Sequence, residues 1–598
     1  MKYPSSIEEI NNEINEFCGN NVLDKEFKNI NFLFTIPDIH GDVMALIDIL
    51  SVYNFIEISI DKYELFDMIQ TYKYVNICEY IDINPKLQNI VLVQTGDILD
   101  GYRTAPSMYD YYYNHDEEAL NIMLKLQDQA NNLHRNVHVI LLYGNHEMNN
   151  LKSMKQIKQY EIEWQGREPR HEERTDYIYN NWKNRMNTGV KLYTNGDYQT
   201  LYKIINKKDV TPPIKYYDIL NKINNENDFQ NTVVLRYERF KKILQKFICQ
   251  YMSIVKINDV ILSHTIITPS SVKLLFRFAK RLYYYTYVSN KNLFREDLSQ
   301  EEKNIKKKIQ DRANTIFDEN KISLYQENNK LQDIVNSYIR YIIYVIYKVI
   351  FIDINTYDNL KSIDYSEDID YSKREQTYLN NDIAIFDDTL FDKMEYILYR
   401  IFAYDPFSNR DKIDKNTLSK QLTFNDSDDF LNTSYDDLDI YPENIYYDSV
   451  QDPVNIKKYI NRQIIISKIR EEDDSEENVY KNICIPNDDD AILKYYNKII
   501  NDTMNLYKVN KIFIGHIPEC YTIKHNIIYT NEKGHSISRE IIYGDTAHSR
   551  SFINNDWTRQ NCKNKLLIVY QFIEVDYKFG EPFFNKDYKY DAKIFIST

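Results

Sequence analysis

The sequence is poor in glycine and cysteine. Its 598 residues contain 12 Gly and 6 Cys, against 54 Tyr. Together with abundant Asn, Ile and Lys, the low glycine content indicates the codon bias of an AT-rich genome, such as that of a large DNA virus or a protozoan, rather than a special function. No two cysteines are spaced as CxxC, so we expect free thiols in a reducing compartment.

Long hydrophobic runs are also missing. The chain starts MKYPSS, without the apolar stretch of a signal peptide, and the most apolar later stretch is interrupted by Arg340 and Lys348. The apolar residues between those two charges are too few to cross a bilayer. We therefore expect a cytoplasmic protein without a membrane segment.

Positive charge is in deficit, with 74 Lys and Arg against 89 Asp and Glu and a net charge of −15. This balance argues against a general nucleic-acid binder, which would neutralise phosphates with basic side chains. The acidic excess gathers at residues 426–429, 435–439, 471–477 and 488–490. A solvated insertion is the favoured interpretation, and a surface that contacts a basic protein partner is the alternative.

Against this background, five short apolar runs each precede a residue that can bind a metal. Bulky apolar runs closed by Gly, Asn, Asp or Ser are typical of strands that are buried on both faces. Side chains just beyond such strand ends converge on one crevice. The runs are residues 31–36 before PDIHGD, 90–93 before GDILD, 139–143 before GNHE, 260–262 before SH and 512–514 before GH.

These blocks supply oxygen and nitrogen donors but no thiolate. Such donors suit Mn, Fe or Zn and argue against a structural zinc cage. Six ligands are too many for one catalytic ion, but they fit two ions that share a carboxylate and hydrolyse a phosphate ester. A lone histidine after a strand is usually a core or loop residue, so the prediction depends on the five blocks together. The predicted donors are Asp38, His40, Asp97, Asn145, His264 and His516.

The order PDIHGD, GDILDG, GNHE, SHT and GHIPE resembles the calcineurin-like metallophosphoesterases, and more narrowly their phosphoprotein phosphatase branch. By this resemblance, Asp38 and His40 would hold the first ion and Asp97 would bridge. Asn145, His264 and His516 would hold the second ion. The resemblance also makes His146 the proton donor to the leaving group, oriented by Asp100. A histidine beside a carboxylate is physically suited to that role because it titrates near neutral pH.

The segment IIYGDTAHSRSF after the last block resembles a DxGxSxxF segment of bacterial and Shewanella-like phosphatases. We expect it in the second sheet, with residues 566–570 and 572–573 as further strand material.

The sequence departs from the family pattern at three places outside the predicted metal ligands. Pro37 replaces the first Gly, Thr265 and Ile266 replace a Gly pair, and Gly101 replaces an arginine that grips phosphate in relatives. A guanidinium binds phosphate as a planar fork, so its loss would weaken substrate binding more than metal binding. Arg103 and Arg400 are the candidate replacements.

The spacing of the blocks predicts the organisation. We expect an α/β fold with a two-sheet β-sandwich flanked by helices, the metallophosphoesterase fold, and a large, mostly helical insertion. Residues 1–28 would form an N-terminal helical extension, 29–270 and 491–598 the catalytic domain, and 271–490 a helical and acidic insertion that could contact a partner. Helices are predicted at 7–17, 237–249, 272–288, 301–317, 331–352, 388–402 and from 491.

The function implied by the resemblance is hydrolysis of a phosphate monoester with two divalent ions, Mn in the first place and Fe or Zn otherwise. Water bound to the ions would act as the nucleophile after losing a proton, and the expected substrate is a phosphorylated serine or threonine protein. One alternative is a nucleotide substrate, as in dinucleoside polyphosphate or RNA-cap hydrolases of the same fold. A catalytically weak, metal-binding interaction protein is the alternative from a different class.

Overall fold

The computed structural model describes most of both predicted sheets and the helices beside them. Every statement below refers to residues 4–19, 27–70, 77–99, 116–133, 135–148, 245–289, 293, 297–351, 481–484, 500–515, 523–530, 536–544, 565–584 and 592–597.

The first sheet contains the strands that precede three of the predicted blocks. Parallel pairing joins β1 to β4, β4 to β5 and β5 to β6, whereas β13 runs antiparallel to β1. The strand order is β14 (Ala592–Ser597), β13 (Lys565–Gln571), β1 (Phe32–Ile36), β4 (Ile90–Gln94), β5 (Val137–Leu142) and β6 (Tyr251–Met252).

The second sheet carries the other two blocks. Strand β10 pairs in parallel with both β8 and β12, while β7 and β11 run antiparallel to their neighbours β8 and β12. The order is β7 (Ile254–Ile257), β8 (Val260–Ser263), β10 (Lys511–Ile514), β12 (Ser536–Tyr543), β11 (Ile523–Thr530) and β9 (Lys481–Cys484).

Side chains from both sheets meet in one hydrophobic cluster. Val91 and Val93 of β4 pack there with Leu262 of β8 and Phe513 of β10. The alternate residues of β4, such as Leu92, instead join the larger core under the helices. Both faces of these strands are therefore buried, which explains why their sequences show no alternation. The predicted two-sheet α/β fold is confirmed.

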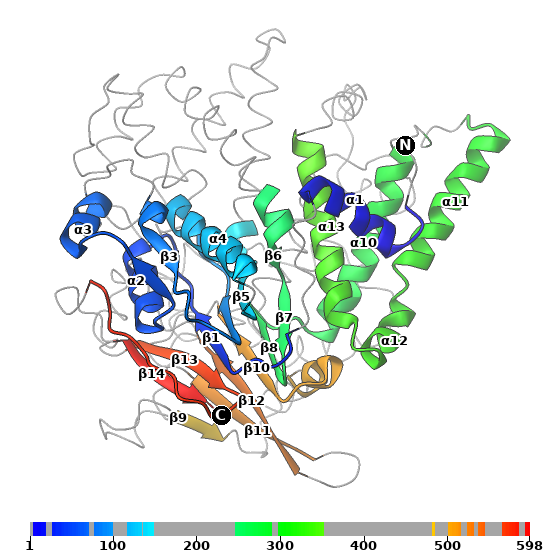
Figure 1. Ribbon diagram of the computed structural model, residues 1–598. Coiled ribbons are helices and arrows are strands. Elements are labelled where there is room, and N and C mark those ends of the chain that lie inside the picture. Colours follow the sequence, from blue (N-terminus) through cyan, green and yellow to red (C-terminus); the bar gives the residue numbers. More distant parts are fainter. Residues whose placement is uncertain are drawn as a thin grey trace, which may run out of the picture.

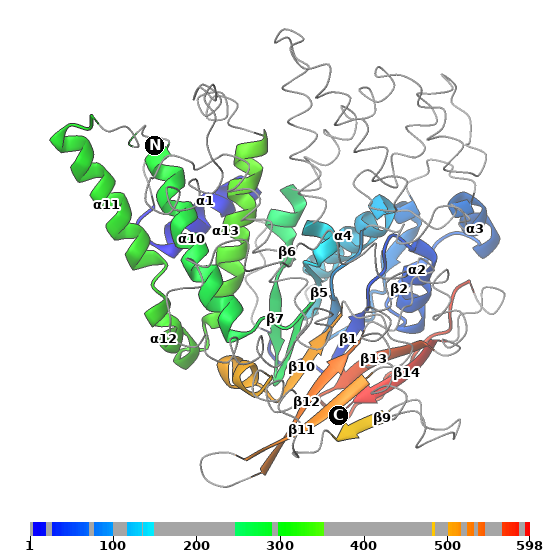
Figure 2. The ribbon, with the colours of Figure 1, turned by 180° about the vertical axis from the view of Figure 1, so that it is seen from behind.

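Helices cover the outer faces in two groups (Figures 1 and 2). Beside the first sheet lie α2 (Val43–Val52), α3 (Lys62–Gln70) and α4 (Asp116–Asn132), together with the small β2 (Ile56–Ile58) and β3 (Ile81–Ile83) pair and a 3₁₀ turn, Ile77–Tyr80. The second group contains α1 (Ile7–Cys18), α10 (Pro269–Ser289), α11 (Gln300–Ile316), α12 (Ile322–Glu327) and α13 (Leu331–Phe351), with a 3₁₀ turn at Glu319–Lys321.

The second helical group is fastened to the sheets through α13. Asn336 accepts hydrogen bonds from the backbone N–H groups of Ser253 and Ile254, at 2.8 and 3.1 Å, and donates to the Ile254 carbonyl. Buried residues of α1, α10 and α13 belong to the same core cluster as the strands. Helices at 7–17, 272–288, 301–317 and 331–352 were thus predicted to within a few residues. The helical segments 245–250 and 500–507 match the ends of two others. The helix predicted at 388–402 and all four acidic segments lie outside the described residues. The division into domains stays a prediction.

Two expectations need correction. Residues 566–570 form β13, which belongs to the first sheet beside β1 rather than the second, and residues 572 and 573 form a bend. Cys18 and Cys249 form a disulfide with their Cα atoms 5.4 Å apart, so the prediction of free thiols is wrong for this pair. Fold contacts between positions 231 residues apart bring the two together, and spacing alone carries no sign of that. The expectation of a reducing compartment loses this support. None of the described helices is both long and apolar enough to span a membrane.

Candidate metal centre

The candidate ligands lie where the strands of the two sheets end. Asp38 and His40 follow β1, Asp97 follows β4, and Asn145 follows β5 at the same edge of the first sheet. His264 follows β8 of the second sheet. Parallel strands end at one edge, so these side chains converge as predicted from the sequence.

Asp97 stands at the middle of the group. Its carboxylate belongs to two sets of three buried side chains whose candidate ligand atoms lie within 4.8 Å of one another. His40 and His146 complete one set, and Asp38 and His264 complete the other. Two sets that share one carboxylate have the composition of a site for two ions.

Backbone carbonyls orient two of the imidazoles. His264 Nδ1 lies 2.9 Å from the Thr95 carbonyl oxygen, and His40 Nδ1 lies 3.1 Å from that of Leu99. A carbonyl oxygen only accepts, so each Nδ1 carries the proton and donates it. In the neutral ring each Nε2 then keeps its lone pair, and this is the form in which an imidazole binds a metal.

These lone pairs point at other acceptors. His264 Nε2 lies 3.0 Å from Asn145 Oδ1 and 3.4 Å from Asp97 Oδ2, and His40 Nε2 is 3.9 Å from the same Asp97 oxygen. Asp97 Oδ2 is buried and accepts no hydrogen bond within the described part of the chain. Acceptors that face one another in a buried site need a positive charge between them. The arrangement therefore fits divalent cations.

The titration behaviour of the centre agrees with this need for positive charge. Burial works to raise the pKa of Asp97, but the imidazoles of His264, His146 and His40 outweigh it and hold that pKa well below its usual range. Burial works to lower the pKa of His264, and the Asp97 carboxylate more than compensates and raises it. In each case the charged form is stabilised by an opposite charge nearby. Bound cations would stabilise the ionised Asp97 carboxylate in the same way.

Glu147 organises the loop that presents Asp97. Its Oε2 accepts from the backbone N–H groups of Gly144 and Asp97 at 2.8 and 2.9 Å, and its Oε1 accepts from Ile98 and Leu99 at 3.0 and 3.1 Å. Burial, and then the Asp97 carboxylate, raise the pKa of Glu147 to about 7, while the hydrogen bonds from Leu99 and Asp97 lower it. Four donors around two oxygens favour the ionised form. The carboxylate thereby ties the loop after β5 to the loop after β4.

Glycines allow the loops to approach this closely. A Cβ on Gly144 would lie 2.2 Å from Asp97 Oδ1, and one on Gly96 would lie 2.7 Å from His264 Nδ1. A Cβ on Gly515 would lie 2.7 Å from Asp38 Oδ1. Gly515 is the first residue of the fifth block, so the beginning of that block lies against Asp38 of the first block.

Six predicted site residues come together in the structure, and their chemical roles stay predictions. They are Asp38, His40, Asp97, Asn145, His146 and His264. Four others lie outside the described residues, namely Asp100, Arg103, Arg400 and His516. His146 sits beside Asp97, with Nε2 3.7 Å from Asp97 Oδ2 and its backbone N–H donating to Asp97 Oδ1 at 2.9 Å. That position is compatible with a proton donor and also with a ligand.

Other contributors were not foreseen from the sequence. The carbonyl groups of Thr95 and Leu99 have no sequence signature, because every residue has a carbonyl. Glu147 was noted only as part of a motif, although a carboxylate that directly follows two site residues could have suggested a supporting role. Asp42, the last residue of PDIHGD, caps α2 by accepting from the Ala45 N–H at 3.0 Å. Its role in the motif is therefore structural.

Comparison with protein families agrees with the geometry. Residues 35–267 match the model of the calcineurin-like phosphoesterase family. The matched range contains the first four blocks and ends before the fifth. Comparisons with curated proteins and with solved structures give no match.

Proposed function

We propose that this chain hydrolyses phosphate monoesters at a two-metal centre, because residues 35–267 match the model of the calcineurin-like phosphoesterase family, a family of metal-dependent hydrolases. The observation that carries the proposal is the sharing of the buried Asp97 carboxylate by two sets of candidate ligands. The family resemblance divides the ligands differently from these two sets, and by it Asp38 and His40 would hold one ion together with Asp97. Asn145, His264 and His516 would complete the other site.

When bound, the two ions would activate water as the nucleophile and neutralise charge on the phosphate. We propose manganese for both positions. The chain's own contribution is to fix the ligands. The Thr95 and Leu99 carbonyls accept hydrogen bonds from Nδ1 of His264 and His40 and so keep the protons on those nitrogens. Glu147 fixes the loop of Asp97 by accepting from its backbone N–H.

His146 is the proposed proton donor to the departing alkoxide. It is 9% exposed, and the hydrogen bond from its backbone N–H to Asp97 fixes its place beside the shared carboxylate. A positioned general acid contributes about 10²- to 10⁴-fold to a rate. The His146→Asn variant should therefore keep its metal content and lose turnover by about that factor. If it instead loses one ion, His146 is a ligand and not the acid.

Asp97→Asn is the complementary variant. It removes the charge that both sets of ligands share, so it should lower metal content and abolish activity together. Metal content is measured by elemental mass spectrometry after gel filtration, and activity with an aryl phosphate and Mn²⁺. Parental metal content and parental rates in both variants would refute the assignment of the centre.

The proposed substrate is a protein phosphorylated on serine or threonine, and the support is the similarity of the five blocks to the phosphoprotein phosphatase branch. Purified protein with Mn²⁺ is offered phosphopeptides, diadenosine polyphosphates, capped RNA and an aryl phosphate. Phosphate release from phosphopeptides at the highest kcat/KM is the expected result. A higher kcat/KM for a nucleotide would refute the protein substrate and favour a nucleotide hydrolase. Bound metal without turnover would favour the alternative of a catalytically weak, metal-binding interaction protein.

A further inference from the structure

Tyr143 connects the candidate metal centre to a distant part of the chain. It follows β5 directly and precedes Gly144, Asn145, His146 and Glu147. Its side chain is 1% exposed, and its hydroxyl donates a hydrogen bond to the carbonyl of Phe247. Its backbone N–H donates to the Met252 carbonyl at 2.9 Å. Both ends of the residue are thus held by the segment 245–252.

Aromatic packing strengthens this attachment. The ring centroids of Tyr143 and Tyr251 are 5.3 Å apart, and those of Phe247 and Tyr251 are 4.8 Å apart. Strand β6 adds only two residues to the sheet, through pairing of Tyr251 with Leu141 and of Met252 with Leu142. So short an edge strand gives little stability by itself. Other contacts must therefore keep the segment 245–252 in place.

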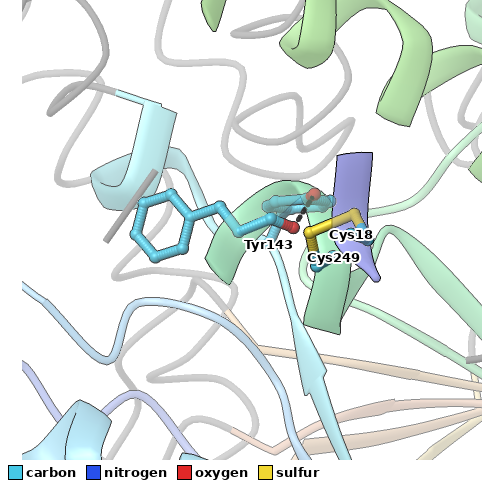
Figure 3. The surroundings of a disulfide bond; sticks show 4 residues. Cys18, Tyr143 and Cys249 are labelled. Carbon is cyan, nitrogen blue, oxygen red and sulfur yellow. Dashed lines mark hydrogen bonds between the residues drawn. A yellow bond between two sulfur atoms is a disulfide. The ribbon is translucent and has the colours of Figure 1, made fainter. Parts of the chain in front are cut away.

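The disulfide is one such contact. Cys249 lies between Phe247 and Tyr251 in the segment, and it is bonded to Cys18 at the end of α1 (Figure 3). Helix α1 in turn buries Ile10 and Ile14 in the common core and forms an ion pair from Glu13 to Lys348 of α13. The bond therefore fastens the segment that holds Tyr143 to a firmly packed helical group.

We propose that Tyr143 is a positioning residue of the metal centre, and that the Cys18–Cys249 disulfide makes its position sensitive to redox state. The inference rests on the proposed metal centre. A dithiol would reduce the bond: the S–S bond breaks, Cys18 and Cys249 each gain one electron and one proton, and the dithiol becomes a disulfide. Reduction releases segment 245–252 from α1, loosens Tyr143 and lowers the affinity of the adjacent loop for metal.

The first test compares two Tyr→Phe variants that each lose one buried hydrogen bond to a carbonyl. Tyr143→Phe loses the bond to Phe247, whereas Tyr338→Phe loses a 2.7 Å bond to Ile316 within the helical group. Loss of a hydrogen bond made directly to a metal ligand lowers affinity about 10- to 100-fold, and the Tyr143 hydroxyl acts on the ligands only through the backbone of its own loop. We therefore expect Tyr143→Phe to weaken Mn²⁺ binding by up to about tenfold and Tyr338→Phe to leave it unchanged. Equal affinity in both variants and the parent would overturn the positioning role.

The second test uses the dithiol directly. Protein purified without reductant is alkylated and digested, and mass spectrometry shows whether Cys18 and Cys249 are bonded. A second sample is reduced, freed of dithiol by anaerobic gel filtration and titrated with Mn²⁺. We expect affinity to fall about tenfold, as in the Cys18→Ala, Cys249→Ala double variant, which should not respond to the dithiol. Cys78→Ser, which changes a described cysteine outside the disulfide, should respond as the parent does.

The outcomes separate the two proposals. Failure of the untreated parent to bind Mn²⁺ would refute the metal centre itself. Normal Mn²⁺ binding before and after reduction, or free thiols at Cys18 and Cys249 in the untreated protein, would refute the redox link alone.

Discussion

Replacing Glu147 with Gln tests how much of the metal centre depends on one buried carboxylate. The two oxygens of Glu147 accept four backbone N–H groups, two on each oxygen. A glutamine has the same shape, but its amide nitrogen would face one of the two pairs of N–H donors. Two buried donors would then have no acceptor, whichever way the amide is turned.

The cost follows from this count. A buried, unsatisfied N–H group costs about 1–3 kcal/mol, so the free energy of unfolding should fall by about 2–6 kcal/mol. Domains of ordinary stability, about 5–15 kcal/mol, often survive such a loss. The released N–H groups belong to Gly144 and Asp97 or to Ile98 and Leu99, so Asp97 moves in either case. Displacement of a catalytic group by about 1 Å lowers rates by about 10²-fold, and we expect a loss of that size in kcat/KM.

The assay combines urea unfolding, Mn²⁺ titration and aryl phosphate hydrolysis. The matched control is Glu302→Gln, in the capping box of α11, where the carboxylate accepts from the Ser299 N–H at 2.8 Å. Glutamine is tolerated in a capping box, so this control should keep parental stability and metal affinity. Unfolding of Glu147→Gln within about 0.5 kcal/mol of the parent, the range of ordinary surface substitutions, would refute the reasoning.

Three further predictions concern space, protons and metal. Gly144→Ala places a methyl group against Asp97 and should cost about 1–3 kcal/mol and lower Mn²⁺ affinity, whereas Gly580→Ala, with its Cβ 2.3 Å from the Ser51 carbonyl, should lose only stability in urea. Burial raises the pKa of Glu118 from 4.5 to about 7, so the folded state binds this proton more tightly than the unfolded chain does. The tighter proton binding stabilises the folded state by at most about 3 kcal/mol, an effect that should be complete below pH 4.5 and lost as the pH rises through 7. In Glu118→Gln, the free energy of unfolding measured at several pH values should not show this decrease. A chelator should lower the melting temperature, because ions at 100 times their Kd add about 2.7 kcal/mol per site; an unchanged melting temperature would contradict the metal centre.

The sequence was sufficient for the strands that carry the site. Five apolar runs correspond to β1, β4, β5, β8 and β10, because strands with both faces buried leave continuous apolar runs that end abruptly. The sequence did not place β13, which returns from residues 565–571 to pair with β1 in the first sheet. The sequence also did not predict the disulfide between Cys18 and Cys249. Both are pairings between distant positions, and neither leaves a local pattern.

The candidate site likewise has a part that was predicted from the sequence and a part that was not. Its donors were predicted, because carboxylate, amide and imidazole groups are visible in a sequence and their order matched a family pattern. The contacts that orient them were not. The carbonyls of Thr95 and Leu99 and the four N–H groups around Glu147 are backbone groups, so their roles depend on how the loops fold and not on which residues they contain.

The loops also explain why one departure from the family pattern leaves the geometry intact. His40 and Asp97 adopt φ values of +46° and +54°, which cost energy in residues other than glycine and persist only when surrounding bonds enforce them. Those bonds are present: the N–H groups of Ile39 and His40 donate to the Asp97 carbonyl at 3.1 and 2.9 Å, and the Gly41 N–H donates to Ile98 at 2.7 Å. Pro37 lacks an N–H group, but it contributes no donor to this set. The bonds that hold the metal loops together therefore do not depend on an N–H group at the first position of the motif.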